Sequence, residues 1–287
     1  MNKNIIEKLK HITIVYNNWI TSVKLMIQEH YDIPEYDNCI IYINVYPSYD
    51  NDTILYLGKF TKRIFYCLEH TLTDNDYDIC LRYYNEPYIK LLIDLNFNEM
   101  WSMDYNYQFT TIWRDRCGFP VKYVPMRYTS LIKSVDNIYT TPKTVDFCMV
   151  GIIIKECTKR RDFIGNVEKD NVFSIKNITQ FKNINSIIPE LNTAKYILDT
   201  NRCYEIHTQN QVRIFELLCM GYTVCVEKSP VNLFPGLIYE YTSIDDLNNI
   251  LIKNEYLHPT KAYKEMTYTD EAYENYVNNL IQLQSND

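Results

Sequence analysis

Residues 210–227 read Asn-Gln-Val-Arg-Ile-Phe-Glu-Leu-Leu-Cys-Met-Gly-Tyr-Thr-Val-Cys-Val-Glu. Apolar residues recur at helical spacing as far as Met220, and Gly221 follows where a helix commonly ends. The next six residues, 222–227, form a short apolar run of the kind that makes a buried strand. A helix that passes through one glycine into a buried strand is part of a parallel α/β unit, so this stretch predicts the fold class.

The same alternation of helix-like and strand-like segments continues in both directions. In the first half, strands are expected at 11–16, 39–45, 63–68, 98–103 and 121–125, and helices at 19–29, 87–95 and 107–117. In the second half, further strands are expected at 145–150, 172–175, 195–199 and 237–241, and helical segments around 159–164, at 187–191 and at 261–283. Ser243 and Asp246 form a capping-box pattern that begins one more helix.

The regular pattern lapses at 128–144, where Pro142 marks a linker. We therefore predict an α/β protein with two Rossmann-like domains, residues 1–140 and 141–258, followed by a helical segment at 259–287. We expect the two parallel sheets to face each other across a ligand cleft.

The composition is that of a folded protein and argues against several classes of function. The net charge is −7, from 29 basic and 36 acidic residues, which does not favour a general nucleic-acid binder. The longest apolar run, Phe147 to Ile154, is far shorter than the ~18 residues of a membrane span. Charged residues interrupt the N-terminal segment, so no signal peptide is expected. We expect a soluble, cytoplasmic protein whose oligomeric state the sequence does not reveal.

The nine cysteines are scattered, with no Cys-x-x-Cys motif and no grouping with the five histidines. Dispersed cysteines in odd number, several of them inside apolar runs, are typical of reduced core thiols rather than of a disulfide framework. A zinc site would need grouped ligands, so none is expected.

Ligands of open parallel sheets bind at the carboxyl ends of the strands, so the residues that follow each strand are the candidates for a site. Gly151 ends one expected strand, and the helix behind it carries Lys159, Arg160 and Arg161. This basic group could bind an anion, or it could be the solvated face of a surface helix.

A second candidate lies where the segment 205–211 leads into the helix that carries Arg213 and Glu216. A helix N-terminus combined with guanidinium groups makes a good diphosphate site. Glu216 lies three residues after Arg213, on the same helix face, where it could accept hydrogen bonds from a ribose diol. The alternative is that the two residues are a surface ion pair.

The segment Arg213-Ile-Phe-Glu-Leu-Leu-Cys-Met-Gly-Tyr-Thr-Val-Cys-Val226 resembles the R-x-[FY]-E-x-[LM]-x-x-G-x-x-[VL] segment of GT-B glycosyltransferases. It is most similar to the group-1-like branch that includes spore-maturation-type proteins. Further segments that are similar to the family's landmarks are 145–151 with Arg160-Arg161, Pro235-Gly236, 239–247, Glu69-His70, 99–102 and 121–126. The abundance of tyrosine, 27 residues against 6 glycines, indicates an AT-rich genome and suits the small glycosyltransferases of some large DNA viruses.

The resemblance implies a donor of the nucleotide-diphosphate sugar type, UDP- or GDP-linked, held by the second domain. The donor-binding residues that it implies are Arg213, Glu216, Arg160, Arg161, Gln211, Asn210 and Gly151. The arginines and the helix N-terminus would neutralise the diphosphate, and Glu216 would bind the ribose. In related folds a last helix crosses back to the first domain, and 259–287 is the segment that would do so here.

The same cations would stabilise the charge that grows on the leaving diphosphate, so the resemblance implies no metal and no other cofactor. Three acidic triplets, at 50–52, 74–76 and 76–78, have the form Asp-x-Asp that could bind a metal ion. We interpret them as acidic loops.

The glutamate pair that retaining relatives often carry, seven residues apart, is absent here, which favours an inverting mechanism with a single base. The base is expected in the first domain, among Glu69, His70 and Asp74, with Asp104 as a further candidate. His70 could equally be a core histidine and Glu69 a helix cap. The predicted activity is sugar transfer to a hydroxyl of a glycan or glycoprotein. A nucleotide-sugar epimerase and a non-catalytic nucleotide-sugar-binding or scaffold protein remain alternatives.

Overall fold

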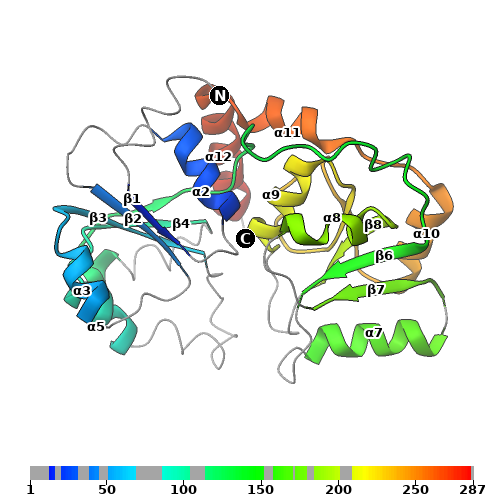
Figure 1. The fold of residues 1–287 in the computed structure, drawn as a ribbon, viewed down its shortest axis with the longest axis horizontal. Helices are drawn as coiled ribbons and strands as arrows, with labels where there is room; N and C mark the ends of the chain where they lie inside the picture. The colour runs from blue at the N-terminus through cyan, green and yellow to red at the C-terminus, as the bar shows by residue number, and fades with distance from the viewer. Residues whose placement is uncertain are drawn as a thin grey trace. The chain divides into compact units, whose positions relative to one another are not determined.

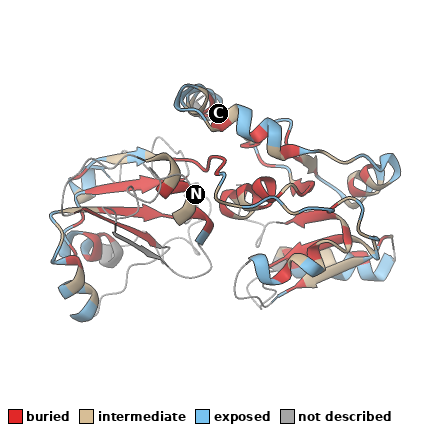
Figure 2. Ribbon diagram, turned by 45° about the horizontal axis from the view of Figure 1, so that its top comes forward, coloured by how far each residue is buried: buried red, intermediate tan, exposed pale blue. Residues whose placement is uncertain are grey.

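The computed structural model describes residues 13–16, 21–31, 39–44, 51–68, 86–103, 114–151, 158–170, 172–179, 184–200 and 209–285. The chain divides into two compact units, Met1–Met126 with Ile281–Asp287, and Arg127–Leu280. In each unit the buried residues concentrate on the sheet and on the helix faces that cover it (Figure 2).

The first unit is built on a five-stranded parallel sheet whose strands lie side by side in chain order. Its strands are β1 (Thr13–Tyr16), β2 (Cys39–Asn44), β3 (Lys62–Cys67), β4 (Glu99–Ser102) and β5 (Val121–Tyr123). Its helices include α2 (Thr21–His30), α3 (Asn51–Leu57) and α5 (Glu86–Asp94) (Figure 1).

Both faces of this sheet are buried, as a parallel sheet requires. Side chains alternate along β3, so Phe65 and Cys67 face one way and pack with residues of α3 and α5 in one apolar core. Tyr66 faces the other way, where its ring lies 5.9 Å from that of Trp101 and its hydroxyl donates to the carbonyl oxygen of Val124 at 2.6 Å.

The second unit contains the strands β6 (Val145–Val150), β7 (Ile175–Ile178), β8 (Ala194–Asp199), β9 (Val224–Glu227) and β10 (Tyr239–Tyr241). Its helical segments are α7 (Thr158–Asp170), η2 (Ile184–Ile187), α8 (Ile188–Leu191), α9 (Gln211–Met220), α10 (Ile244–Lys253), α11 (Pro259–Thr267) and, as far as Leu280, α12 (Asp270–Ser285). All strand pairs are parallel, and the spatial order is β10-β9-β8-β6-β7. The order reverses direction between β6 and β8, which is the topological switch point of a doubly wound sheet. The prediction of an α/β protein with two Rossmann-like parallel sheets is therefore confirmed.

Local signals in the sequence account for many boundaries. Asn210 caps α9 by accepting from the amide of Arg213, and Gly221 ends it in the left-handed conformation. Ser243 and Asp246 form the expected capping box at the start of α10. The cysteines that lie in the described residues are free thiols, and five of these six are buried.

One strand in the second unit differs from its expected extent, and one helix in the first unit was not expected. The strand expected at 172–175 begins only at Ile175, because Phe173 packs its ring 4.8 Å from that of Phe147 before the ladder starts. Ser174, between Phe173 and Ile175, donates from its amide and its hydroxyl to the carboxylate of Asp146, and its carbonyl oxygen accepts from the amide of Phe147. Helix α3 was not expected at all, since Leu57 is its only buried residue and Leu55 is 69% exposed, so it shows no amphipathic period.

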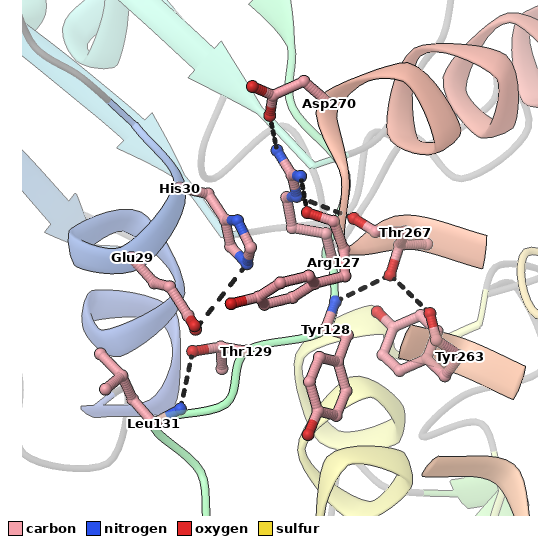
Figure 3. A network of polar contacts seen from close by, with 10 residues as sticks. Glu29, His30, Arg127, Tyr128, Thr129, Leu131, Tyr263, Thr267 and Asp270 are labelled. Atoms are coloured by element: carbon pink, nitrogen blue, oxygen red, sulfur yellow. Dashed lines mark hydrogen bonds and ion pairs between the residues drawn. The ribbon is translucent and has the colours of Figure 1, made fainter. Parts of the chain in front are cut away.

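The helical segment expected at 261–283 is interrupted between α11 and α12 (Figure 3). Arg127, only 2% exposed, donates to the carbonyl oxygen of Thr267 at 2.9 Å and to that of Tyr268 at 2.5 Å. These carbonyls would otherwise accept from the next helical turn, so the guanidinium stabilises the break. Thr269 then caps α12 by accepting from the amide of Ala272 at 3.2 Å.

The segment 128–144, expected as a linker, is irregular but bound to the second unit. The amide of Val135 donates to the carbonyl of Met220 at 2.9 Å, and the hydroxyl of Tyr139 donates to that of Gly221 at 2.6 Å. This segment is therefore part of the second unit's packing. Within the described residues, no helix has both the length and the hydropathy needed to cross a bilayer.

Candidate anion-binding site

The candidate site lies in the second unit, at the carboxyl ends of β6 and β8. These two neighbouring strands flank the switch point, where ligands of doubly wound sheets bind. β6 is followed by Gly151, and β8 ends at Asp199 and is followed by Thr200. The residues that sequence analysis placed in a donor site can be traced outward from these ends.

Arg160 links the ends of the two strands. Its side chain comes from the first turn of α7, is 5% exposed, and donates from Nη2 to the carbonyl oxygen of Thr200 at 2.8 Å. The guanidinium also lies against Gly151, where an added Cβ would come within 3.0 Å of its Cζ and still closer to Nη1. Gly151 is therefore required by the approach of Arg160, and the charge of Arg160 lies at the switch point.

Arg213 is held in place by an unexpected partner. Its Nη1 forms an ion pair with Oδ1 of Asp199, whose side chain is 3% exposed. The Arg213 side chain is 21% exposed, and within the described part of the chain its Nε and Nη2 have no acceptor. These two groups can form the paired hydrogen bonds with which a guanidinium binds a phosphate.

The N-terminus of α9 adds a further donor set. The cap residue Asn210 bonds to the amide of Arg213 at 3.2 Å, so the first turn is well formed. Gln211, the first helical residue, is 1% exposed. The amides of the first turn and the helix dipole favour an anion at this end of the helix.

Glu216 does not pair with Arg213, whose ion pair goes to Asp199. The two residues are the partly exposed positions of α9, and its other side chains are buried. They therefore share the one face of the helix that is open to solvent. Both the surface ion pair and the binding of a ribose by Glu216 require the two residues to lie on such a face. The ion-pair alternative is not what the structure contains, and the ribose role stays a prediction.

The three basic residues of α7 take three different environments. Arg160 is buried at the switch point, whereas Lys159 forms an ion pair with Glu227 at the end of β9. The side chain of Arg161 is 52% exposed, and its Nε lies 3.9 Å from Oδ1 of Asp162. The structure thus brings Arg160 to the strand ends and leaves Arg161 on the outer surface of the helix.

Sequence analysis did not single out Asp199, Thr200 or Gln209. Asp199 could have been suspected because, like Glu227, it is an acidic residue at the end of an apolar strand. Gln209 precedes the cap of α9, is 1% exposed, and accepts from the amide of Leu233 at 2.8 Å. Nothing in its local sequence marks it as buried.

The catalytic candidates Glu69, His70 and Asp74, and also Asp104, lie outside the described residues. The same holds for most of the acidic triplets at 50–52, 74–76 and 76–78, so the metal-independent prediction stays a prediction.

The second unit is thus a doubly wound α/β unit with two arginines and a helix N-terminus at its switch point. No protein-family model and no curated protein matches the chain. Among solved structures, the pneumococcal O-GlcNAc transferase GtfA in complex with UDP and GlcNAc has a TM-score of 0.44 at 10% identity over 85% of this chain and 57% of that chain. Sucrose-phosphate synthase from Thermosynechococcus elongatus has a TM-score of 0.43 at 10% identity, over 87% of this chain and 71% of that chain. AviGT4, a glycosyltransferase involved in avilamycin A biosynthesis, has a TM-score of 0.36 at 10% identity, over 87% of this chain and 99% of that chain.

The chain spans little more than half the length of GtfA. At such low similarity, the activity of this chain has to be argued from its own residues.

Proposed function

We propose that the protein is a GT-B-type glycosyltransferase that transfers a sugar from a UDP- or GDP-linked donor to a hydroxyl of a glycan or glycoprotein. The proposal places the donor's diphosphate in the second unit, at Arg160, Arg213 and the N-terminus of α9. The observation that carries it is the ion pair of Arg213 with Asp199, which fixes a guanidinium beside a helix N-terminus at the switch point.

The chemistry follows from the charges in this place. When the bond between the sugar and the diphosphate breaks, negative charge grows on the leaving nucleotide. Cations that are already held in position stabilise this charge without reorganising during the reaction. Arg160 is held by Thr200 and Gly151, and Arg213 by Asp199, so both guanidinium groups meet this condition. We infer that they take the role that a divalent metal has in other glycosyltransferases.

The acceptor hydroxyl needs a base, which we place among Glu69, His70 and Asp74 of the first unit. A single base that removes the proton during in-line attack gives inversion at the anomeric carbon. Glu216, on the solvent-facing side of α9, is the proposed partner of the ribose diol.

The test is a titration of the native protein with UDP, GDP, UMP and GMP by calorimetry. We expect the diphosphates to bind at least tenfold more tightly than the monophosphates, because the site's charge is directed at the diphosphate. The matched control is Lys195→Gln. Lys195 lies near the amino end of β8, away from the proposed site, and the substitution breaks its ion pair with Asp146 of β6. This variant should bind like the native protein.

Mass spectrometry of the protein with nucleotide sugars then separates an enzyme from a binding protein. Release of free nucleotide, with transfer to water or to an added glycan, supports the transferase. Tight binding of UDP or GDP with no turnover of any donor in the panel points to the non-catalytic alternative. Absence of nucleotide binding contradicts the proposed function.

A further inference from the structure

In the buried carboxamide of Gln209 the oxygen accepts a hydrogen bond, whereas the nitrogen has no acceptor in the described residues. Its Oε1 accepts from the amide of Leu233 at 2.8 Å, in the segment that follows β9. This bond fixes the orientation of the side chain, because only the oxygen of a carboxamide can accept from an amide. Nε2 is therefore the other branch of the group, and it carries two N–H donors.

Nε2 of Gln209 is buried and has no acceptor within the described part of the chain. The whole residue is 1% exposed. A buried donor without an acceptor is uncommon in folded proteins, because it loses its bonds to water and gains none in return. An apolar side chain of similar size would avoid this cost, so the position calls for an acceptor from outside the described residues.

Gln209 lies at the same edge of the sheet as the proposed donor site. It immediately precedes Asn210, the cap of α9, and its partner Leu233 follows the carboxyl end of β9. β9 is the neighbour of β8, whose carboxyl end carries Asp199 and its ion pair with Arg213. An anion at the N-terminus of α9, which begins at Gln211, would therefore be bound two residues from Gln209 along the chain.

We propose that Gln209 is a further donor-binding residue, whose Nε2 donates a hydrogen bond to an oxygen of the bound nucleoside diphosphate. This inference rests on the proposed function. Gln209 adds an uncharged hydrogen-bond donor to the two arginines of the site. Its bond to the amide of Leu233 fixes the direction of this donor before the ligand binds. Such preorganisation lowers the cost of ordering on binding.

Two variants separate contact with the ligand from a purely structural role. Gln209→Glu keeps an oxygen for the amide of Leu233 and replaces the donor Nε2 by a second acceptor. Gln209→Met removes both. If Gln209 only anchors the segment at Leu233, the Glu variant should bind nucleotide like the native protein and the Met variant should bind less tightly.

If Nε2 contacts the nucleotide, the Glu variant should lose at least as much affinity as the Met variant. We expect the Kd for UDP or GDP, measured by calorimetry at pH 8, to rise about tenfold in the Met variant and more in the Glu variant. The control is Glu190→Gln. Oε2 of Glu190 is also buried without a partner in the described residues, but Glu190 lies in α8, before the amino end of β8 and so away from the proposed site. It should bind like the native protein.

The melting temperature without nucleotide shows whether each variant folds. If the Glu variant does not fold, the Met variant decides: a Kd like that of the native protein, or a rise in Kd together with a lowered melting temperature, overturns the inference. A tenfold rise in Kd with an unchanged melting temperature supports it, because a lost anchor at Leu233 would lower the melting temperature. If the native protein binds UDP or GDP and the Glu variant binds equally well, Gln209 is not a ligand contact, although the proposed function stands. If the native protein binds neither, the proposed function fails, and this inference fails with it.

Discussion

Arg213 and Asp199 form an ion pair that ties the first turn of α9 to the last residue of β8. The carboxylate is 3% exposed and the guanidinium 21%, so the pair lies where the buried strand end meets solvent. Arg213 therefore has two roles: it neutralises a buried acid, and it keeps two N–H groups for an anion. A substitution at Arg213 changes both, and the experiments must separate them.

Arg213→Ala is expected to abolish binding of UDP and GDP and also to lower the free energy of unfolding by about 2–3 kcal/mol, because Asp199 stays buried without a cation. The double variant Arg213→Ala with Asp199→Asn removes the unpaired charge. It should recover most of the stability and none of the binding. Urea unfolding followed by circular dichroism, together with calorimetry, gives both values. A double variant that binds nucleotide like the native protein would show that the diphosphate lies elsewhere.

Gly151→Ala is expected to weaken nucleotide binding and to destabilise the second unit, because the new methyl group would occupy the position of the Arg160 guanidinium. Gly165→Ala is the matched control: it lies within helix α7, and an added Cβ there meets no atom within 4 Å. The control should raise the free energy of unfolding by about 0.5–1 kcal/mol, since alanine favours a helix. Equal effects of the two substitutions on binding would contradict the role of Arg160.

Glu99 should make the first unit sensitive to acid. Burial acts to raise its pKa, but bonds from Lys122, Lys62 and Trp101 outweigh this and lower the pKa from 4.5 to about 2. The stabilisation is thus fully present above pH 4.5 and is lost as the pH falls towards 2. Since both lysines are partly exposed, we expect about 1–2 kcal/mol after screening by solvent.

The measurement compares the native protein with Glu99→Gln by urea unfolding at pH 6 and pH 3. All three tryptophans belong to residues 1–126, so tryptophan fluorescence reports on the first unit. The native protein should be the more stable at pH 6, and the difference should shrink at pH 3. A difference that is the same at both pH values would mean that the ion pairs do not set the pKa of Glu99.

The base is tested by Glu69→Gln, His70→Ala and Asp74→Asn. We expect one of them to lower the rate of sugar transfer by two or more orders of magnitude while the Kd for the nucleotide changes less than about twofold, because a base acts on the acceptor proton and not on the donor. Near-normal rates in all three variants would exclude this segment as the source of the base.

The sequence predicts those features of the fold that local signals encode. Helix α9 and strand β9 were expected within two residues of their observed bounds, because Asn210, the apolar period and Gly221 are all local. The contact of Arg160 with Gly151 and Thr200 depends on β6 lying next to β8, and the hydrophobic pattern does not encode this strand order.

The partner of Arg213 was missed for a similar reason. Asp199 lies 14 residues before Arg213 in the chain, and the two meet only when the end of β8 and the first turn of α9 come together. The break between α11 and α12 also depends on a distant residue, since Arg127 lies 140 residues before Thr267. Neither partner can be read from helical or strand periodicity.

The bonds of Arg127 set a practical limit on how the second unit can be produced as a recombinant fragment. Its guanidinium is bonded to Thr267, Tyr268 and Asp270 and lies over the ring of Tyr273 at 4.3 Å. A truncation that stops after α10 would remove these three acceptors and the ring of Tyr273. Expression plasmids for donor-binding assays should therefore encode the polypeptide from Arg127 through at least the first turns of α12.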